Sequence, residues 1–479
     1  MRVAIAIDPA SAAPLHRQIY DEWRRGILSG RFRTGERVPS TRDLAGTLGV
    51  ARATVAAAYD QLTAEGYLEA SHGSGTFVCR RLPEDLLRAH HAPREQPSSD
   101  APMRLSRYGR RTADQPEYAP PRVRPGWISF AQWRPDLSEF PFPIWQKLLA
   151  RNLRAADPRM FDYSAGGWPL DALRREIAAY VARSRAVRAE ADQVIVVNGS
   201  QQALDLCARL LVDPGDEVAI EEPGYQGARQ IFQTCGARLR PMRVGADGVD
   251  PRGLSRTTRV LYVTPSHQFP AGASLSVARR LELIEWARRS GAAILEDDYD
   301  SEYRYNGPPL PAMQGLAGGA PVIYIGTFSK VMFPGLRIGY VIAPKSLAQA
   351  FARAKWLADR QTPMLEQATL ADFLREGHLE RHIRKMRRLY GRRREALVES
   401  LGRHFGDRAQ VLGDPAGMHA LVRFADDGVR ERAEAARVQI VGSAAYYLGN
   451  APANEFVFGF STLGERTIRE GVRRIAGMN

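Results

Sequence analysis

Six short apolar runs between residues 194 and 344 constrain the fold of this chain most strongly. Segments with helical periodicity separate the runs, which are VIVV (194–197), VAI (218–220), VLYV (260–263), AAIL (292–295), VIYIG (322–326) and YVIAP (340–344). Strands that alternate with helices predict a mostly parallel sheet with helices on both faces. We therefore expect an α/β domain from about residue 127 onward. The Arg-rich helical patterns near the end of the chain indicate a smaller α/β subdomain there.

Residues 14–79 show a different, mainly helical pattern. Leu15, Ile19, Trp23 and Ile27 recur every four residues, which places them on one apolar face of a helix. A second short helix is expected after Ser40, which can cap it together with Asp43, and Gly49 ends it. A third helix begins at once in ARATVAAAYDQLTAEGY. Two helices joined by a tight glycine turn are typical of a helix-turn-helix unit.

The end of this segment predicts a β-hairpin. Two short β-prone runs flank the glycine-rich SHGSG in YLEASHGSGTFV, as in the wing of a winged helix-turn-helix. About forty consecutive residues, VPSTRDLAGTLGVARATVAAAYDQLTAEGYLEASHGSGTFV, resemble the winged helix-turn-helix of GntR-superfamily regulators. The resemblance implies that the protein binds double-stranded DNA at operator half-sites. We expect Arg52 and Thr54 near the major groove, and Arg42, His72 and Ser74 at phosphates or the minor groove.

The charge of the chain agrees with a DNA partner but does not establish one. The net charge is +14 at pH 7, and basic side chains that neutralise phosphates release counterions. Residues 1–79 carry nine Arg against eight acids, whereas residues 80–126 carry ten Arg against six acids. The latter segment also holds eight Pro and has no sustained apolar period, so it predicts a semi-extended linker. Because 479 residues exceed what one core usually organises, we expect a multidomain protein. Its predicted parts are a DNA-binding domain at 1–79, the linker at 80–126 and an effector domain at 127–479.

One of only five lysines in the chain, Lys330, lies in GTFSKVMFPGLRIGY directly after the VIYIG run. A lysine at a strand end, beside Thr327, Ser329 and Arg337, is placed to form an imine with an aldehyde next to an anion pocket, because hydroxyls and a guanidinium suit a phosphate dianion. The segment resembles the Schiff-base lysine motif of fold-type I aminotransferases. That resemblance implies pyridoxal 5'-phosphate as the cofactor and Lys330 as the catalytic residue.

Further motifs follow in the order of that family. In VIVVNGSQQALDL, a strand leads into the start of a helix, where free N–H groups favour phosphate, and Ser200 and Gln201 match the family's phosphate contacts. Tyr225, just after another strand, matches the aromatic side chain that stacks on the cofactor ring. Asp297, with Asp298 as the less favoured choice, matches the carboxylate beside the pyridine nitrogen. Tyr299 is expected to contact the ring oxygen.

The segment YVTPSHQFPAG resembles that of MocR-type regulators, the GntR branch fused to an aminotransferase-like domain. Phe269 stands where aminotransferases have an Asn that bonds the ring oxygen, so this contact is either absent or made by another group such as His267. The resemblance covers residues 14–79 and 127 to about 465. It implies a homodimer, commonly head-to-tail, and a fold-type I large domain with a small C-terminal α/β subdomain.

Val457 departs from the aminotransferase pattern. In similar proteins an Arg before a Gly-Phe pair binds the substrate carboxylate, whereas NEFVFGFSTL places Val457 at that point. An amino acid would then lose a bidentate charged pair, unless Arg229 or Arg423 replaces it. We expect a regulator that senses pyridoxal phosphate, an amine or an amino acid through an aldimine on Lys330, with at most residual transaminase activity. A catalytically active aminotransferase with an accessory DNA-binding domain is the alternative.

The remaining sequence features favour a cytoplasmic protein. Cys79, Cys207 and Cys235 are widely spaced and lack a CxxC pair, so neither a disulfide framework nor a zinc or other metal site is expected. The first residues hold too short an apolar stretch for a signal peptide. The chain also has no apolar run near the roughly 18 residues that span a bilayer, so no membrane partner is expected.

Overall fold

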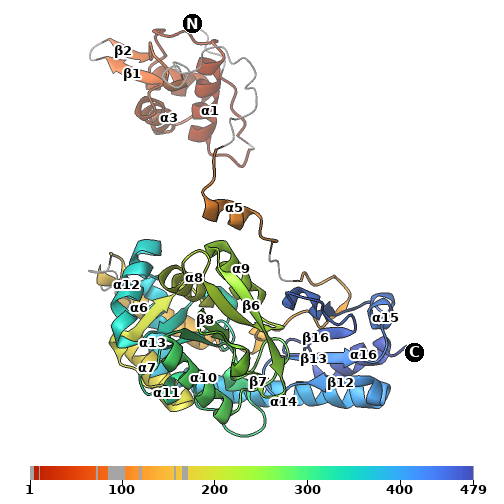
Figure 1. The fold of residues 1–479 in the computed structure, drawn as a ribbon. Coiled ribbons are helices and arrows are strands. Elements are labelled where there is room, and N and C mark those ends of the chain that lie inside the picture. The colour runs from red at the N-terminus through yellow and green to blue at the C-terminus, as the bar shows by residue number, and fades with distance from the viewer. Residues whose placement is uncertain are drawn as a thin grey trace. The chain divides into compact units, whose positions relative to one another are not determined.

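Two compact units make up the chain, Met1–Arg104 and Leu105–Asn479 (Figure 1). The computed structural model describes residues 5–9, 11–71, 74–84, 103–117, 121–155, 158–163 and 171–477. Among these residues, no helix combines the length and apolar character needed to cross a membrane.

In its described residues, the first unit has three helices and a hairpin. They are α1 (Leu15–Leu28), α2 (Thr41–Leu48), α3 (Arg52–Ala64), β1 (Leu68–Ser71) and β2 (Gly75–Val78). The Asp43 N–H donates to Oγ of Ser40 at 3.1 Å, and Gly49 ends α2 with a φ of 65°. Strands β1 and β2 pair antiparallel, with Leu68 opposite Val78. The predicted helix-turn-helix and wing are therefore confirmed.

A single apolar core holds this unit together. Trp23 of α1 is fully buried, and its ring lies 4.3 Å from that of Phe32 and 5.9 Å from that of Tyr59 on α3. Val55 and Leu62, one and three turns along α3, are buried against the same cluster. Because these side chains occupy one face of α3, the start of that helix keeps its other face in solvent.

Part of the predicted linker forms a helix instead of an extended chain. Helix α5 (Arg107–Ala113) begins after Ser106, whose Oγ accepts a hydrogen bond from the Gly109 N–H at 2.9 Å. Arg111 donates to the Thr234 carbonyl at 2.8 Å, which holds α5 against helix α9 (Gln226–Cys235). The expectation of a semi-extended segment is thus corrected here, because a serine cap and one arginine order this stretch on the second unit.

An eight-stranded sheet forms the centre of the second unit. Its strands lie in the order β4 (Val194–Val197), β11 (Gly339–Ile342), β10 (Val322–Thr327), β9 (Ala293–Asp298), β8 (Thr258–Val263), β5 (Glu217–Glu222), β6 (Arg238–Gly245) and β7 (Gly248–Val249). The strands from β10 to β6 are parallel, whereas β11 and β7 run antiparallel to their neighbours. Each of the six apolar runs overlaps a strand, so the predicted, mostly parallel sheet is confirmed.

Alternate side chains of the central strands enter cores on opposite faces of the sheet. In β4, Ile195 and Val197 pack with α8 (Ser200–Leu211), α9 and α12 (Lys345–Asp359). Val194 and Val196 face the other way. The helices on that face are α6 (Phe142–Ala155), α7 (Asp171–Arg185), α13 (Met364–Arg375), α10 (Val277–Ser290) and α11 (Met313–Leu316).

A smaller α/β subdomain ends the chain, as the sequence predicts. Its antiparallel sheet has the order β12 (Ala409–Leu412), β13 (His419–Phe424), β16 (Glu455–Gly459) and β15 (Val441–Gly442). Its helices are α14 (His378–Phe405), α15 (Val429–Ala435) and α16 (Glu465–Ile475). Strand β3 (Ile128–Ser129) pairs with β14 (Val438–Gln439), which joins the start of this unit to the subdomain.

Candidate functional site

A cavity of about 230 Å³ opens where several strands of the large sheet end. It is lined by Trp133, Ser200, Tyr225, Tyr262, Thr264, Phe269, Asp297, Tyr299, Thr327, Ser329, Lys330, Pro334 and Arg337. Ser200 follows β4, Tyr225 follows β5, Thr264 follows β8, and Thr327 ends β10. Ligands of open α/β sheets bind at such carboxyl ends because the loops there converge on one crevice.

Lys330 stands in the wall of this cavity. Its Nζ donates a hydrogen bond to the Trp133 carbonyl at 3.0 Å. Burial lowers the pKa of Lys330, against the opposing attraction of Asp300 and Asp297. A lowered pKa raises the fraction of neutral amine, which is the form that attacks a carbonyl carbon.

An anion cradle lies at the start of α8. Ser200, Thr327, Ser329 and Arg337 share the cavity wall there, and the N-terminus of α8 adds free N–H groups and the positive end of its dipole. Arg337 reaches this point because Gly199 has no side chain: a Cβ there would lie 2.7 Å from Nη2 of Arg337. Within the described residues, the buried Oγ of Ser329 has no hydrogen-bond partner, so it is available to a ligand.

Asp297 brings a buried carboxylate to the opposite part of the cavity. Its Oδ2 accepts a hydrogen bond from Tyr262 at 2.8 Å, while Oδ1 has no partner among the described residues. Burial raises the pKa of Asp297 to about 7. A ligand that presents an N–H cation would satisfy Oδ1 and stabilise the ionised carboxylate.

Asp298, the alternative to Asp297, does not line the cavity. Arg185 donates to its Oδ2 at 2.6 Å, and Tyr324 donates to the same oxygen at 2.6 Å. Burial alone would raise the pKa of Asp298, but these two partners hold it below its ordinary value. Asp298 is therefore a paired structural charge.

The structure places eight of the ten predicted cofactor contacts in the cavity wall. They are Ser200, Tyr225, Asp297, Tyr299, Thr327, Ser329, Lys330 and Arg337. Gln201 lies outside it and accepts a hydrogen bond from the Tyr225 hydroxyl at 3.2 Å. His267 is also outside: its Nδ1 lies 3.0 Å from the Tyr299 hydroxyl and 3.0 Å from Oδ1 of Asp300. Its hydrogen bond to the cavity wall is with Tyr299.

Several wall residues escaped the sequence reasoning. Trp133 precedes Lys330 by 197 residues, and no local pattern connects the two. Tyr262 is visible in the sequence only as part of a buried strand, although a hydroxyl in such a strand signals a polar partner. Thr264 and Pro334 carry no signal beyond their places after a strand and in the lysine loop.

The position expected to bind a substrate carboxylate is apolar. Val457 of β16 is fully buried and lies opposite Leu421 of β13. It belongs to an apolar cluster with Phe269, Leu421 and Tyr446, and the cavity residue Trp133 packs against that cluster.

The two arginines considered as substitutes have other partners. Arg229 donates to the carbonyls of Tyr447 and Ala445 at 2.8 and 2.9 Å. Arg423 donates through Nε to Glu455 at 2.9 Å. Neither arginine lines the cavity, so their suggested role as a carboxylate clamp is not supported.

The predicted DNA contacts lie on the solvent side of the first unit. Arg42 and Ser74 are exposed, and Thr54 is half-buried. Arg52, at the first residue of α3, is exposed and donates through Nε to Oγ1 of Thr41 at 3.2 Å. His72 lies outside the described residues.

Known families match both units. Residues 15–78 match bacterial regulatory proteins of the gntR family, and residues 139–450 match aminotransferase class I and II. The chain is 39% identical over 477 residues to the probable rhizopine catabolism regulatory protein MocR of Rhizobium meliloti, covering 98% of this chain and 95% of the relative. It is 31% identical to the pyridoxine biosynthesis regulator PdxR of Corynebacterium glutamicum, covering 97% and 96%.

The second unit also matches aminotransferases of known structure. LysN, an α-aminoadipate aminotransferase of Thermus thermophilus solved with N-(5'-phosphopyridoxyl)-L-leucine, superposes with a TM-score of 0.67 at 30% identity. That match covers 74% of this chain and 92% of LysN. Kynurenine aminotransferase of Pyrococcus horikoshii superposes with a TM-score of 0.68 at 28% identity, covering 73% and 90%.

The cofactor of this family is pyridoxal phosphate, and the cavity fits it. Oδ1 of Asp297, which has no partner among the described residues, suits the pyridinium N–H. The Ser329 hydroxyl, likewise without a partner there, lies in a cradle with Arg337 that suits the phosphate. Lys330 supplies the amine that the aldehyde requires. A GntR-type DNA-binding domain and an aminotransferase-like unit thus occur on one chain, which belongs to the MocR-type transcription regulators.

Proposed function

We propose that this protein regulates transcription in response to an amine that lacks an α-carboxylate, sensed by pyridoxal phosphate held on Lys330. The observation that carries the proposal is the cavity itself. It combines a lysine, a buried acid and an anion cradle with an apolar wall at the position of the usual carboxylate clamp.

The residues of the chain have distinct roles in this proposal. Lys330 would hold pyridoxal phosphate, whose aldehyde carbon would supply the chemistry for exchange between amines. Asp297 holds the proton of the ring nitrogen, and Tyr225 packs on the ring. Ser200, Ser329 and Arg337 bind the phosphate.

Three other predicted contacts complete the cofactor site. Thr327 joins the phosphate cradle. Gln201 accepts a hydrogen bond from the Tyr225 hydroxyl and thereby orients the aromatic ring of Tyr225. His267 acts through Tyr299, whose hydroxyl it positions for the ring oxygen. This arrangement offers a partner to that oxygen although Phe269 replaces the usual Asn.

The cationic side chains around the cavity limit the effector class. Among the described residues that line it, only Lys330 and Arg337 carry positive charge, and both are committed to the cofactor. An α-carboxylate would therefore face Val457, Phe269 and Trp133 without a partner. Burying such a charge unpaired costs several kcal/mol, whereas an amine without the carboxylate avoids this cost.

Absorption spectra test the cofactor site first. Purified wild type with added pyridoxal phosphate should show a visible band of the lysine-bound cofactor, and Lys330→Ala should lack it under the same conditions. A band of equal intensity in both proteins, or in neither, would refute covalent binding at Lys330.

Matched ligand pairs test the effector class. Phenethylamine with phenylalanine, tyramine with tyrosine, and isoamylamine with leucine differ only in the carboxylate. Spectral titration of the cofactor-loaded protein should give each amine at least about tenfold tighter binding than its amino acid, because tenfold corresponds to only about 1.4 kcal/mol. Equal or tighter binding of the amino acids would exclude this effector class while leaving the cofactor site intact.

On the DNA side, we propose that Arg52 and Thr54 contact bases and that Arg42, His72 and Ser74 contact the backbone or minor groove. The exposed start of α3 supports this, because recognition helices read bases with their first turns. We infer that the protein is a homodimer and acts in the cytoplasm. We also propose that its chain is divided into a DNA-binding domain up to residue 79, a linker up to residue 126 and an effector domain. Light scattering and localisation of a tagged chain test the first two inferences.

Coupling between the two units has a strict test. A coupling free energy is reciprocal, so the effector must change DNA affinity by the factor by which DNA changes effector affinity. Calorimetry of an amine with and without an operator duplex should give unequal dissociation constants. Equal constants would refute the regulatory mechanism.

Transamination is the second candidate function. The chain is 33% identical over 366 residues to 2-aminoadipate transaminase of Thermus thermophilus, which supports it. The apolar surroundings of Val457 oppose it. Conversion of the cofactor to its amine form by excess amino donor, followed spectrally without DNA, distinguishes an active enzyme from a sensor.

A further inference from the structure

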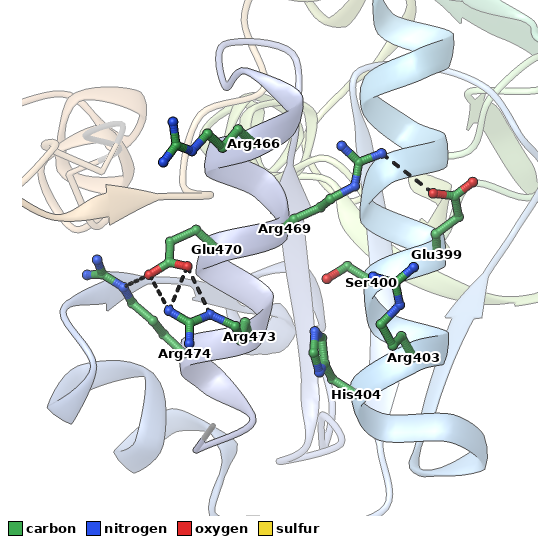
Figure 2. Close-up of a pocket in the computed structure, with 9 residues that line it drawn as sticks. All are labelled: Glu399, Ser400, Arg403, His404, Arg466, Arg469, Glu470, Arg473 and Arg474. Atoms are coloured by element: carbon green, nitrogen blue, oxygen red, sulfur yellow. Dashed lines mark hydrogen bonds and ion pairs between the residues drawn. The ribbon is translucent and has the colours of Figure 1, made fainter. Parts of the chain in front are cut away.

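A concentration of unbalanced positive charge lies away from the cofactor cavity, in a groove between α14 and α16. The groove has a volume of about 720 Å³ and is lined by Glu399, Ser400, Arg403, His404, Arg466, Arg469, Glu470, Arg473 and Arg474 (Figure 2). Five arginines thus face two glutamates, which leaves an excess of three positive charges.

The sequence of α16 explains why its arginines point outward. Ile468, Val472 and Ile475 recur at helical spacing and are buried in the subdomain core. Arg466, Arg469, Arg473 and Arg474 fall on the remaining face. Apolar packing therefore orients the helix and presents its arginines to the groove.

Ion pairs engage three of the five arginines of the groove. Arg469 reaches Glu399 of α14 at 3.6 Å, and Glu470 serves both Arg473 and Arg474 (Figure 2). In the part of the chain that the structure describes, Arg403 and Arg466 have no ion-pair or hydrogen-bond partner. Ion pairs that solvent reaches contribute little to stability, so an arginine can exchange its glutamate partner for a phosphate at little cost.

The basic face continues along α14. Arg381, Lys385, Arg388 and Arg392 recur at helical spacing and line a second hollow of about 420 Å³ with one acid, Glu139. Arg403 lies on the same face, three turns beyond Arg392. We call these side chains, together with the arginines of the groove, the basic strip.

We propose that the basic strip binds the phosphodiester backbone of DNA. This contact on the effector unit would add to the one made by the helix-turn-helix. Guanidinium groups match phosphate oxygens in pairs. From Arg466 to Arg474, α16 advances about 12 Å, a length over which one DNA strand presents about three or four phosphates. The strip offers several arginines at this spacing without an apolar centre, which is the composition of a nucleic-acid surface and not of a protein interface.

Salt dependence of DNA binding tests this proposal. The probe is a labelled mixed-sequence duplex of about 60 base pairs, which is longer than a single helix-turn-helix domain covers. Arg403→Gln combined with Arg466→Gln removes two exposed charges from the strip. Arg243→Gln combined with Arg256→Gln removes two exposed charges from the region of β6 and serves as the matched control.

The expected result concerns the slope of log affinity against log salt. Each lost phosphate contact reduces the slope by about 0.9. Between about 50 and 200 mM salt, the wild type should therefore lose about tenfold more affinity than the strip variant. The control variant should match the wild type. A strip variant with the slope of the wild type, or a control variant that falls equally, would overturn the proposal whether or not the protein binds pyridoxal phosphate.

Discussion

Gly199→Ala is the substitution that tests the anion cradle most directly. Gly199 precedes α8 with φ 83° and ψ 169°, a conformation that residues with a Cβ rarely adopt. A Cβ at this position would also lie 2.7 Å from Nη2 and 3.0 Å from Cζ of Arg337. Because the end of a flexible side chain moves more easily than backbone, we expect Arg337 to leave the cradle.

Two contributions set the size of the effect. The backbone strain costs about 1–3 kcal/mol of folding stability. Loss of a charge-assisted hydrogen bond from Arg337 to the phosphate costs about 1.5–3 kcal/mol, which corresponds to a dissociation constant for pyridoxal phosphate about ten- to hundredfold higher. The hydrogen bond from Arg337 to the Asn198 carbonyl, now 2.9 Å, would be lost as well.

Absorption titration of the cofactor and thermal unfolding measure these contributions separately. Gly402→Ala is a matched control, since Gly402 lies within α14 and a Cβ there would meet no atom within 4 Å outside the backbone of its own helix. The control should bind the cofactor as the wild type does and gain about 0.5–1 kcal/mol of stability. Wild-type cofactor affinity in Gly199→Ala would refute the assignment of Arg337 to the phosphate.

Three further predictions concern the cavity and the DNA-binding unit. Val457→Arg should reverse the preference for amines, so that an amino acid binds at least about tenfold more tightly than its matched amine in a spectral titration; an unchanged preference in a folded variant would show that the carboxylate does not lie there. Burial raises the pKa of Asp297 to about 7, so its proton stabilises the cofactor-free fold at low pH and this contribution is lost as the pH rises through about 7. The melting temperature of the cofactor-free wild type should therefore fall relative to Asp297→Asn between about pH 5 and pH 8, and a constant difference would contradict the buried, protonated acid. Arg42→Gln should weaken binding to all DNA sequences alike, whereas Arg52→Gln should change sequence preference. Selection of bound sequences from a random DNA library measures both effects. The opposite pattern would make Arg52 the phosphate contact and Arg42 the base contact.

Local patterns were sufficient for most elements of the fold. Ser40, Asp43 and Gly49 mark both ends of α2 through capping and a left-handed turn, which depend only on neighbouring residues. The six apolar runs mark strands because burial on both faces demands continuous apolar side chains. The helix α5 was missed because its stability comes from Arg111 bonding to Thr234, a contact between residues distant in sequence.

The sequence by itself determined which chemical groups this protein carries: a lysine after a strand, an acid at the end of another, a glycine-serine turn before a helix, and a reading head at the start of the chain. Strand ends reveal such groups because the order of elements in a parallel sheet brings its carboxyl ends together. Only the tertiary structure decided which groups share one cavity. It brought Trp133 to Lys330, paired Asp298 with Arg185, and engaged Arg229 and Arg423 elsewhere. It also placed Asp297 in the cavity wall, with Oδ1 lacking a partner among the described residues. These outcomes depend on contacts between residues far apart in the sequence. A buried charge without a partner costs free energy, so the partners are whichever groups the fold brings close.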